Sequence, residues 1–161
     1  MHDIGRLYRG LKLLDEAAPY LEESFSISPC YQNLKELIRL QLDFADVNSA
    51  FELIKLLLSL DLENPTVFND SIHFANEGNF TGTLFEYLKS LADDQERDSL
   101  PKANCLYYAG QILLRRDTKQ AKKYLCAARK IFCKLFPSKH AVFKAIQFSI
   151  KQCDSSETLN K

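Results

Sequence analysis

The sequence has few of the residues that break helices or build turns. Only 5 glycines and 5 prolines occur among 161 residues, which leaves little material for a loop-rich or β-rich fold. No apolar run approaches the roughly 18 residues that a membrane-spanning helix requires, so we expect no membrane span. The segment from Met1 to Gly5 lacks a basic start followed by an apolar core, so we expect no signal peptide. With 46% hydrophobic and 26% charged residues, the composition is that of one folded domain.

Motifs of common catalytic and metal sites are also missing. The glycines are dispersed, so there is no phosphate-binding loop, and no serine stands in a Gly-x-Ser-x-Gly turn. His2, His73 and His140 lie far apart, and no cysteine or histidine stands near them at zinc-ligand spacing. We therefore expect neither an enzyme nor a bound metal or cofactor.

The cysteines are odd in number and are never spaced as Cys-x-x-Cys. Such thiols remain free in a reducing compartment. We expect an intracellular, cytoplasmic protein, with a nuclear location left open, and free, mostly buried thiols at Cys30, Cys105, Cys126, Cys133 and Cys153.

A formal net charge of zero conceals a segregation of charge along the chain. From Asp43 to Asp98 there are 12 acidic and 3 basic residues, whereas from Lys102 to Lys144 there are 11 basic residues and 1 acidic residue. Helical proteins often have such solvated charge, but a basic end could also steer an acidic partner toward the molecule. Both interpretations stay open.

Small residues recur at a fixed interval. Ala17, Ala50 and Thr83 are 33 residues apart, and each lies in an apolar helical pattern after a short polar junction. A period of this length with two helices per repeat is typical of an α-solenoid, whose repeats bury their apolar faces by stacking. We expect helix pairs over 1–29, 31–63, 65–92 and 101–136, a capping helix over 138–152 and a polar tail over 153–161. The first helix starts almost at Met1, so the chain could be a fragment of a longer solenoid.

Individual residues predict faces and ends of these helices. Ile4, Leu7, Tyr8 and Leu11 recur at helical spacing in the first helix. The sequence further predicts that Pro19 lies in the first turn of the second helix, where a missing N–H costs little, and that later helices have side-chain caps. The expected caps are Asp46, Asp117 or Thr118, and Ser138.

The pattern of small and bulky residues resembles the tetratricopeptide repeat. Its members here are Gly5, Tyr8, Ala17, Leu21, Ser24 and Pro29, then Ala50, Ile54 and Leu57, then Gly78, Thr83, Tyr87 and Ser90, then Gly110, Ala121, Leu125 and Ala128. Ile38 and Ser71 depart from the helix-A glycine, and Leu57 is large where a small residue is usual. The resemblance implies an all-α, right-handed superhelix of about four hairpins plus a capping helix. It also implies a non-catalytic scaffold or adaptor that binds a peptide or helix of a partner protein in a concave groove.

The first helices of such repeats line the groove, so the resemblance implies a set of binding residues. The candidates are Lys35, Arg39, Leu42, Asn69, Ile72, Asn76, Asn104, Tyr108, Gln111 and Arg115. Ordinary solvated or packed helix is the alternative reading of each. The family's carboxylate clamp for chaperone tails is not reproduced in either possible register, and Glu36 would repel a carboxylate, so a co-chaperone role is not expected.

A basic segment from 115 to 134 supports a rival function. Five of its lysines could share part of a helix face and contact phosphates, although no aromatic platform for bases lies beside them. Nucleic-acid binding is therefore the weaker alternative, beside pairing with an acidic protein segment or with the acidic middle of a second copy in a homo-oligomer. The lysines are Lys119, Lys122, Lys123, Lys130 and Lys134.

Overall fold

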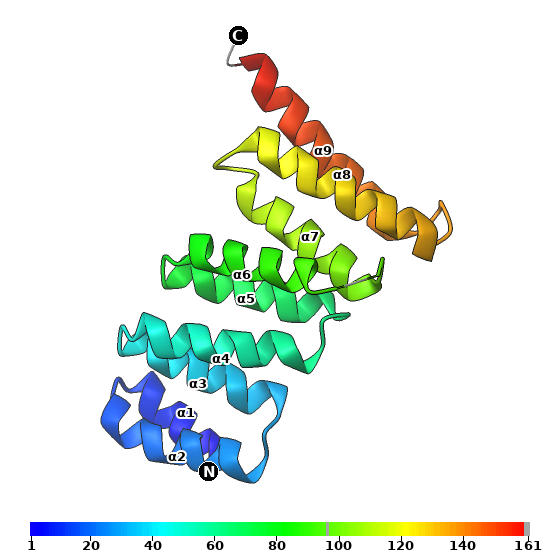
Figure 1. The fold of residues 1–161 in the computed structure, drawn as a ribbon. Coiled ribbons are helices and arrows are strands. Elements are labelled where there is room, and N and C mark those ends of the chain that lie inside the picture. Colours follow the sequence, from blue (N-terminus) through cyan, green and yellow to red (C-terminus); the bar gives the residue numbers. More distant parts are fainter. Residues whose placement is uncertain (96, 160–161) are drawn as a thin grey trace. The chain divides into compact units, whose positions relative to one another are not determined.

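The computed structural model describes residues 1–95 and 97–159, with side chains as far as residue 155. Nine helices and no strand occur in these residues, which confirms the predicted all-α fold (Figure 1). The chain divides into two compact units, Met1–Phe80 (unit 1) and Thr81–Lys161 (unit 2). In the described residues, no helix is both long and apolar enough to cross a membrane.

Unit 1 is a succession of five helices in which each packs on the next. The third helix also contacts the first and the fifth, so these three adjoin one another and form what we call the odd-helix face. The helices are α1 (His2–Gly10), α2 (Leu14–Ile27), α3 (Tyr31–Asp43), α4 (Val47–Leu60) and α5 (Pro65–Glu77).

One kind of turn ends all three odd helices of unit 1. Lys12, Ala45 and Asn79 have left-handed backbone conformations, with φ of 63°, 59° and 58°. After each of them, a backbone N–H donates to the carbonyl five residues earlier: Leu13 to Tyr8, Asp46 to Gln41 and Phe80 to Ala75. This is the bond pattern of a Schellman helix end. The repeat read from the sequence is therefore also present in the backbone, at intervals of 33 and 34 residues.

Small residues allow the helices of unit 1 to approach closely. Ala17 is buried in a cluster with Leu21, Leu37 and Leu40, which joins α2 to α3. A Cβ atom at Gly5 would lie 2.7 Å from the side chain of Leu21, so α1 and α2 require glycine at this crossing. Asp46 caps α4 by accepting a hydrogen bond from the N–H of Ser49, as predicted.

One expectation for the start of the chain is wrong. Pro19 lies inside α2 rather than in its first turn, because the helix already begins at Leu14, which packs on the core cluster. Pro19 has no backbone N–H to donate. Because Pro19 is exposed, the missing backbone hydrogen bond lies on the solvent side of the helix. Of the apolar residues that recur at helical spacing in the first helix, only Tyr8 packs on the core, and Ile4, Leu7 and Leu11 are exposed.

Unit 2 contains the remaining helices, α6 (Thr81–Asp93), α7 (Leu100–Leu113), α8 (Thr118–Leu135) and α9 (Ala141–Leu159). Helix α7 packs between α6 and α8, and α9 packs on α8. A Cβ atom at Gly110 would lie 2.9 Å from Leu125, so a glycine again marks a close crossing, here of α7 and α8. Of the two predicted caps for α8, the structure selects Asp117, which accepts from the N–H of Gln120.

Helix α9 differs from its prediction at both ends. It begins at Ala141, and the N–H of Val142 donates to the His140 side chain, so Ser138 does not cap it. It continues to Leu159 and so includes most of the expected polar tail. The reason lies in the apolar stripe: Ile146, half-buried Ile150 and buried Cys153 extend one helix face beyond residue 152.

Candidate binding site

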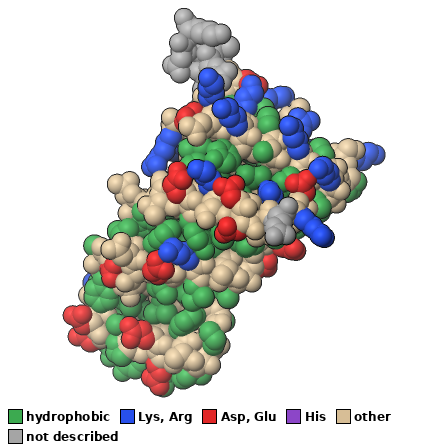
Figure 2. Space-filling model, viewed as in Figure 1, with side chains coloured by type: hydrophobic (Ala, Val, Ile, Leu, Met, Phe, Trp, Pro, Cys, Tyr) green, Lys and Arg blue, Asp and Glu red, His purple; other side chains and the backbone are tan. Residues whose placement is uncertain are grey.

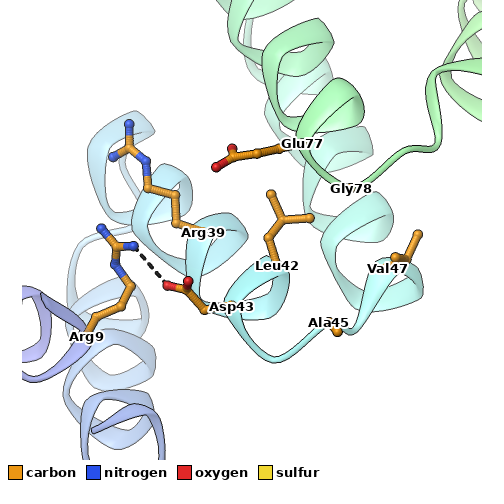
Figure 3. Close-up of a pocket in the computed structure, with 8 residues that line it drawn as sticks. All are labelled: Arg9, Arg39, Leu42, Asp43, Ala45, Val47, Glu77 and Gly78. Atoms are coloured by element: carbon orange, nitrogen blue, oxygen red, sulfur yellow. Dashed lines mark hydrogen bonds and ion pairs between the residues drawn. The ribbon is translucent and has the colours of Figure 1, made fainter. Parts of the chain in front are cut away.

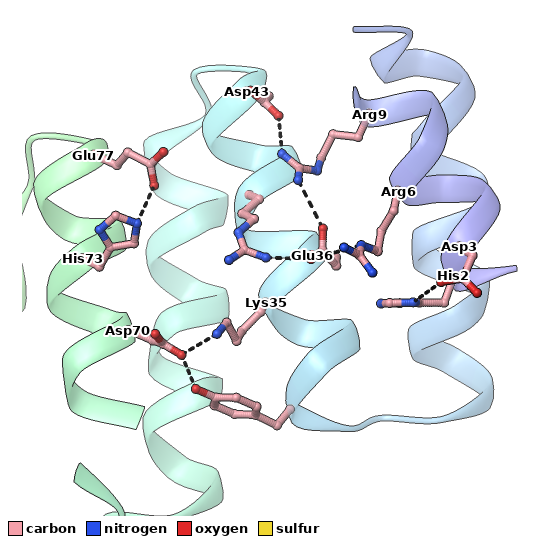
Figure 4. Close-up of polar contacts among 12 residues, drawn as sticks. His2, Asp3, Arg6, Arg9, Lys35, Glu36, Asp43, Asp70, His73 and Glu77 are labelled. Atoms are coloured by element: carbon pink, nitrogen blue, oxygen red, sulfur yellow. Dashed lines mark hydrogen bonds and ion pairs between the residues drawn. The ribbon is translucent and has the colours of Figure 1, made fainter. Parts of the chain in front are cut away.

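A buried carboxylate stands at the centre of the odd-helix face. The Glu36 side chain on α3 is 6% exposed and has three arginines around it (Figure 4). Its Oε1 atom lies 2.6 Å from Nη1 of Arg39 and 3.7 Å from Nε of Arg6, and its Oε2 atom lies 3.3 Å from Nη2 of Arg9. Because a buried charge is stable only when it is paired, these arginines are what allows Glu36 to be charged there.

Asp43 extends this network toward the end of α3. It accepts hydrogen bonds from Nη1 of Arg9 and from Nζ of Lys12, both at 3.0 Å. Partial burial opposes ionisation of Asp43, but the two cationic donors outweigh it and lower the pKa of this carboxyl group. Arg9 thus bridges Glu36 and Asp43 and fixes α1 against α3.

Asp70 forms a second polar centre between α3 and α5. Its carboxylate accepts from Nζ of Lys35 at 2.7 Å and from the hydroxyl of Tyr31. Burial opposes ionisation here too, and the hydrogen bonds from Lys35 and Tyr31 still lower the pKa of Asp70. Burial, together with the bond to Asp70, raises the pKa of Tyr31. His73 and Glu77 lie 3.8 Å apart farther along α5.

A pocket lies next to the network in unit 1, with a volume of about 380 Å³. Arg39 lies over the ring of Phe74, at 5.7 Å from its centroid, and Leu42, Ala45 and Val47 give the pocket an apolar wall (Figure 3). We call it the Arg39 pocket, and its lining residues are Arg9, Arg39, Leu42, Asp43, Ala45, Val47, Glu77 and Gly78.

Arg39 is the side chain of this pocket that is best placed to bind a ligand. It is 34% exposed, and its Nη1 atom donates to Glu36. A guanidinium group has five N–H donors, so most of its capacity is left for a bound carboxylate. Beside the apolar wall, this arrangement suits a carboxylate that is attached to an aliphatic group.

The predicted groove residues of unit 1 differ in their exposure and in their contacts. Arg39 and Leu42 come together in the Arg39 pocket. Lys35 is engaged by Asp70, and its side chain is only 15% exposed. Asn69 and Asn76 are exposed on α5, while Ile72 is half-buried.

In unit 2, most of the predicted groove residues take part in packing. Asn104 and Tyr108 are buried, and Gln111 donates from Nε2 to the hydroxyl of Ser149 on α9, at 2.7 Å. Arg115 is exposed beyond the end of α7. Among these four, only Arg115 offers an exposed side chain.

The predicted basic patch lies on α8, where Lys119, Lys123, Lys130 and Lys134 are exposed. Their spacing of four, seven and four residues puts them on one side of the helix. Lys134 pairs with Asp98 and lowers the pKa of that carboxyl group by donating a hydrogen bond to it. Lys122 is turned toward α9, where it pairs with Asp154. Figure 2 shows lysine and arginine side chains gathered over this unit.

The arginine network was not predicted, although the sequence contains a signal for it. Arg6 and Arg39 are 33 residues apart, so they occupy equivalent positions in the first two helix pairs. Both point at Glu36 because the odd helices adjoin. From the sequence alone, Glu36 is expected only to repel a carboxylate, because the cations that surround it come from distant positions.

The thiols are free, as expected, but fewer are buried than expected. Cys105 and Cys153 are buried, Cys126 is intermediate, and Cys30 and Cys133 are exposed. Burial raises the pKa of Cys105 to about 12, so this thiol is unreactive. In the described part of the chain, no three His, Cys, Asp or Glu side chains are grouped so that they could hold a metal ion.

Comparisons of the chain with protein-family models, with curated proteins and with solved structures find no match.

Proposed function

We propose that this chain is a non-catalytic protein-interaction module, a scaffold or adaptor, and that unit 1 binds a peptide or helix of a partner protein at the Arg39 pocket. The partner segment contributes a carboxylate to Arg39 and an aliphatic group to the wall formed by Leu42, Ala45 and Val47.

A superhelix of the tetratricopeptide type is part of this proposal. The recurring turn at Lys12, Ala45 and Asn79 supports it, as do the small residues where helices cross. In such an architecture the first helices of successive pairs lie next to one another and form an extended surface for a ligand. The adjoining α1, α3 and α5 of unit 1 agree with this expectation.

The observation that carries the proposal is the exposure of the Arg39 side chain and its position at the pocket. The two other cations of the odd-helix face that are mostly buried are held by carboxylates of the same face: Arg9 by Glu36 and Asp43, and Lys35 by Asp70. Arg39 also touches Glu36, but it is half-exposed, lies over an aromatic ring and borders the pocket. A planar guanidinium that is oriented in this way binds a carboxylate through two parallel hydrogen bonds.

A peptide selection tests the proposal. A library of random peptides is selected against the full chain, and the selected peptides are titrated against the variants Arg39→Ala, Arg39→Lys and Arg129→Ala. We expect peptides that contain an acidic residue next to an aliphatic one, and binding about tenfold weaker or worse with Arg39→Ala. Arg39→Lys should weaken binding less than Arg39→Ala does, since lysine keeps the positive charge but cannot donate two parallel hydrogen bonds.

Arg129→Ala is the matched control, because Arg129 is an exposed arginine on α8 in the other unit. It should leave the affinity unchanged. Selected peptides that bind Arg39→Ala as tightly as the unaltered chain would refute the proposal.

Nucleic-acid binding by α8 is a second candidate, which is favoured by the exposed row of Lys119, Lys123 and Lys130. Phosphate contacts release counterions, so affinity for a single-stranded or duplex oligonucleotide should fall steeply as salt is raised. Replacing these three lysines with glutamate should abolish binding. An affinity that is insensitive to both changes would eliminate this candidate.

A further inference from the structure

Unit 1 exposes an apolar stripe on α1. Ile4, Leu7 and Leu11 are 46%, 64% and 61% exposed, and their spacing of three and four residues puts them on one side of the helix. Ile27, near the end of α2, is 69% exposed. Single exposed apolar residues are ordinary, but a row of them along one helix indicates a surface that binds something.

The second helix pair shows what kind of neighbour this stripe takes. Ile4 and Leu7 are 33 residues before Leu37 and Leu40, which are 5% and 0% exposed. Those two leucines are buried against Ala17 and Leu21 of α2, and Leu53 of α4 packs on the same cluster. The position equivalent to Leu53 in the first pair is Tyr20. In the second helix pair, a helix with an apolar stripe therefore covers the positions equivalent to Ile4 and Leu7. Such a helix would also fit over Ile4 and Leu7 in the first pair.

Acidic side chains lie on α2 to either side of Tyr20, whose ring stacks on Tyr8 of α1 with 5.5 Å between the ring centroids. The α2 positions that share a side with Tyr20 are Glu16 and Glu23, four residues before it and three after it. Both are exposed, and neither forms an ion pair with any residue that the structure describes. We call this surface, made of Ile4, Leu7, Leu11, Glu16, Tyr20, Glu23 and Ile27, the α1–α2 face.

Helix α9 has an outer side of complementary chemistry. Phe148 is 64% exposed, and Lys144 and Lys151 are exposed four residues before it and three after it. The small side chains of Ala141 and Ala145 are exposed beside them. Within the residues described, neither lysine is in an ion pair.

We propose that α9 of one copy docks across the α1–α2 face of a second copy. Glu16 and Glu23 are seven residues apart, as are Lys144 and Lys151, so each pair spans about 10.5 Å along its helix at 1.5 Å per residue. Helices packed side by side could therefore form both ion pairs at once. Phe148 lies between the two lysines and would then cover Tyr20, which lies between the two glutamates, and Leu7 on the neighbouring helix α1.

Charge favours this pairing over a symmetric contact between two α1–α2 faces. Unit 1 has 6 basic and 13 acidic residues, and unit 2 has 15 basic and 8 acidic residues. A symmetric contact would bring the glutamates of both copies together, whereas contact with α9 brings lysines to them. Because the two surfaces differ, a pair of copies retains one free α1–α2 face and one free α9, and association continues into rings or open chains.

Two single variants distinguish docking of α9 on the α1–α2 face from a symmetric contact between two α1–α2 faces. Leu7→Glu removes one surface and Phe148→Glu removes the other, and both side chains are exposed, so the core is untouched. We expect the unaltered chain to associate at low salt in sedimentation velocity, and each variant alone to be monomeric. A mixture of the two should form a 1:1 dimer, since each supplies the surface that the other lacks. Circular dichroism should show unchanged helix content in both.

Charge reversal gives a second, independent measurement. Glu16→Lys with Glu23→Lys, or Lys144→Glu with Lys151→Glu, should each weaken association about tenfold or more. Mixing the two reversed proteins should restore it. A monomeric unaltered chain at every concentration, association of Phe148→Glu by itself, or reversed proteins that do not pair would each overturn the proposal.

Discussion

The two units use basic residues in opposite ways. Unit 1 has only 6, but five of these lie on or next to α1 and α3, where they surround Glu36, Asp43 and Asp70. Unit 2 has 15, and many stand exposed along α8 and α9 with few carboxylates near them. The unit with the negative net charge thus contains the Arg39 pocket, whose lining has two arginines, Arg9 and Arg39, beside the carboxylates of Asp43 and Glu77. Net charge describes how a unit attracts a partner from a distance, whereas the local pairing of side chains decides what binds on contact.

The units also differ in regularity. Three turns of unit 1 share a left-handed residue and the same backbone bond, whereas no residue described in unit 2 has a positive φ. Between α7 and α8 the N–H groups of Arg116 and Asp117 both donate to the carbonyl of Leu113. The fourth helix pair therefore turns by another geometry.

The largest expected effect is on the core of unit 2. Phe132 is 1% exposed and packs with Ile131 and Ile146, so Phe132→Ala should lower the free energy of unfolding by about 3–5 kcal/mol. Hydrogen exchange should accelerate most in α7, α8 and α9. The control is Lys130→Ala, which shortens an exposed side chain on the same helix, α8, and should change stability by no more than about 0.5 kcal/mol. Equal losses for the two variants would mean that these burial assignments are wrong.

A smaller effect distinguishes the ion pairs of the two units. Glu36→Gln leaves Arg6, Arg9 and Arg39 without the buried charge that they share, and should cost about 2 kcal/mol because the arginines are partly solvated. Lys134→Ala breaks an exposed pair with Asp98 and should cost far less, because solvent screens that pair. Urea unfolding measures both. An equal loss in the free energy of unfolding for Lys134→Ala and Glu36→Gln would contradict this difference between the ion pairs of the two units.

The smallest effect concerns pH. The pKa values of Asp43 and Asp70 are lowered in the folded state, so their contribution to stability is present above the ordinary aspartate pKa of about 4 and is lost as pH falls through the lowered values. Asp43→Asn and Asp70→Asn should each cost about 1 kcal/mol near pH 7, and the cost should shrink toward pH 2.

The control for the pH series is Glu22→Gln, which alters an exposed carboxylate in the middle of α2, away from the helix N-terminus. Its effect on stability should be close to zero across the same range. A cost for Asp43→Asn that grows as the solution is acidified would contradict the assigned direction of the pKa shift.

Sequence periodicity predicted the elements that local chemistry specifies. The helix pairs, the caps at Asp46 and Asp117 and the close crossings at small residues follow from spacing and side-chain type. Helical spacing also marked Ile4, Leu7 and Leu11 as one face. It could not reveal that this face is exposed, because burial depends on which helix lies next to it.

The polar site required contacts between residues that are distant in sequence. Arg9 and Asp43 are 34 positions apart, and Tyr31 and Asp70 are 39 apart, so only the adjacency of α1, α3 and α5 brings them together. The burial of Asn104 and Tyr108 was missed for a related reason. A polar residue on an amphipathic helix has the same pattern whether it faces solvent or a packed neighbour.

The most direct test is NMR shift mapping on the full chain, labelled with ¹⁵N, as a selected acidic peptide is added. The amides of Arg39, Leu42, Ala45, Val47 and Gly78 should shift together and saturate with one affinity, since these residues line one pocket. Shifts confined to α8 and α9, with the pocket amides unmoved at saturation, would contradict the assignment of binding to unit 1.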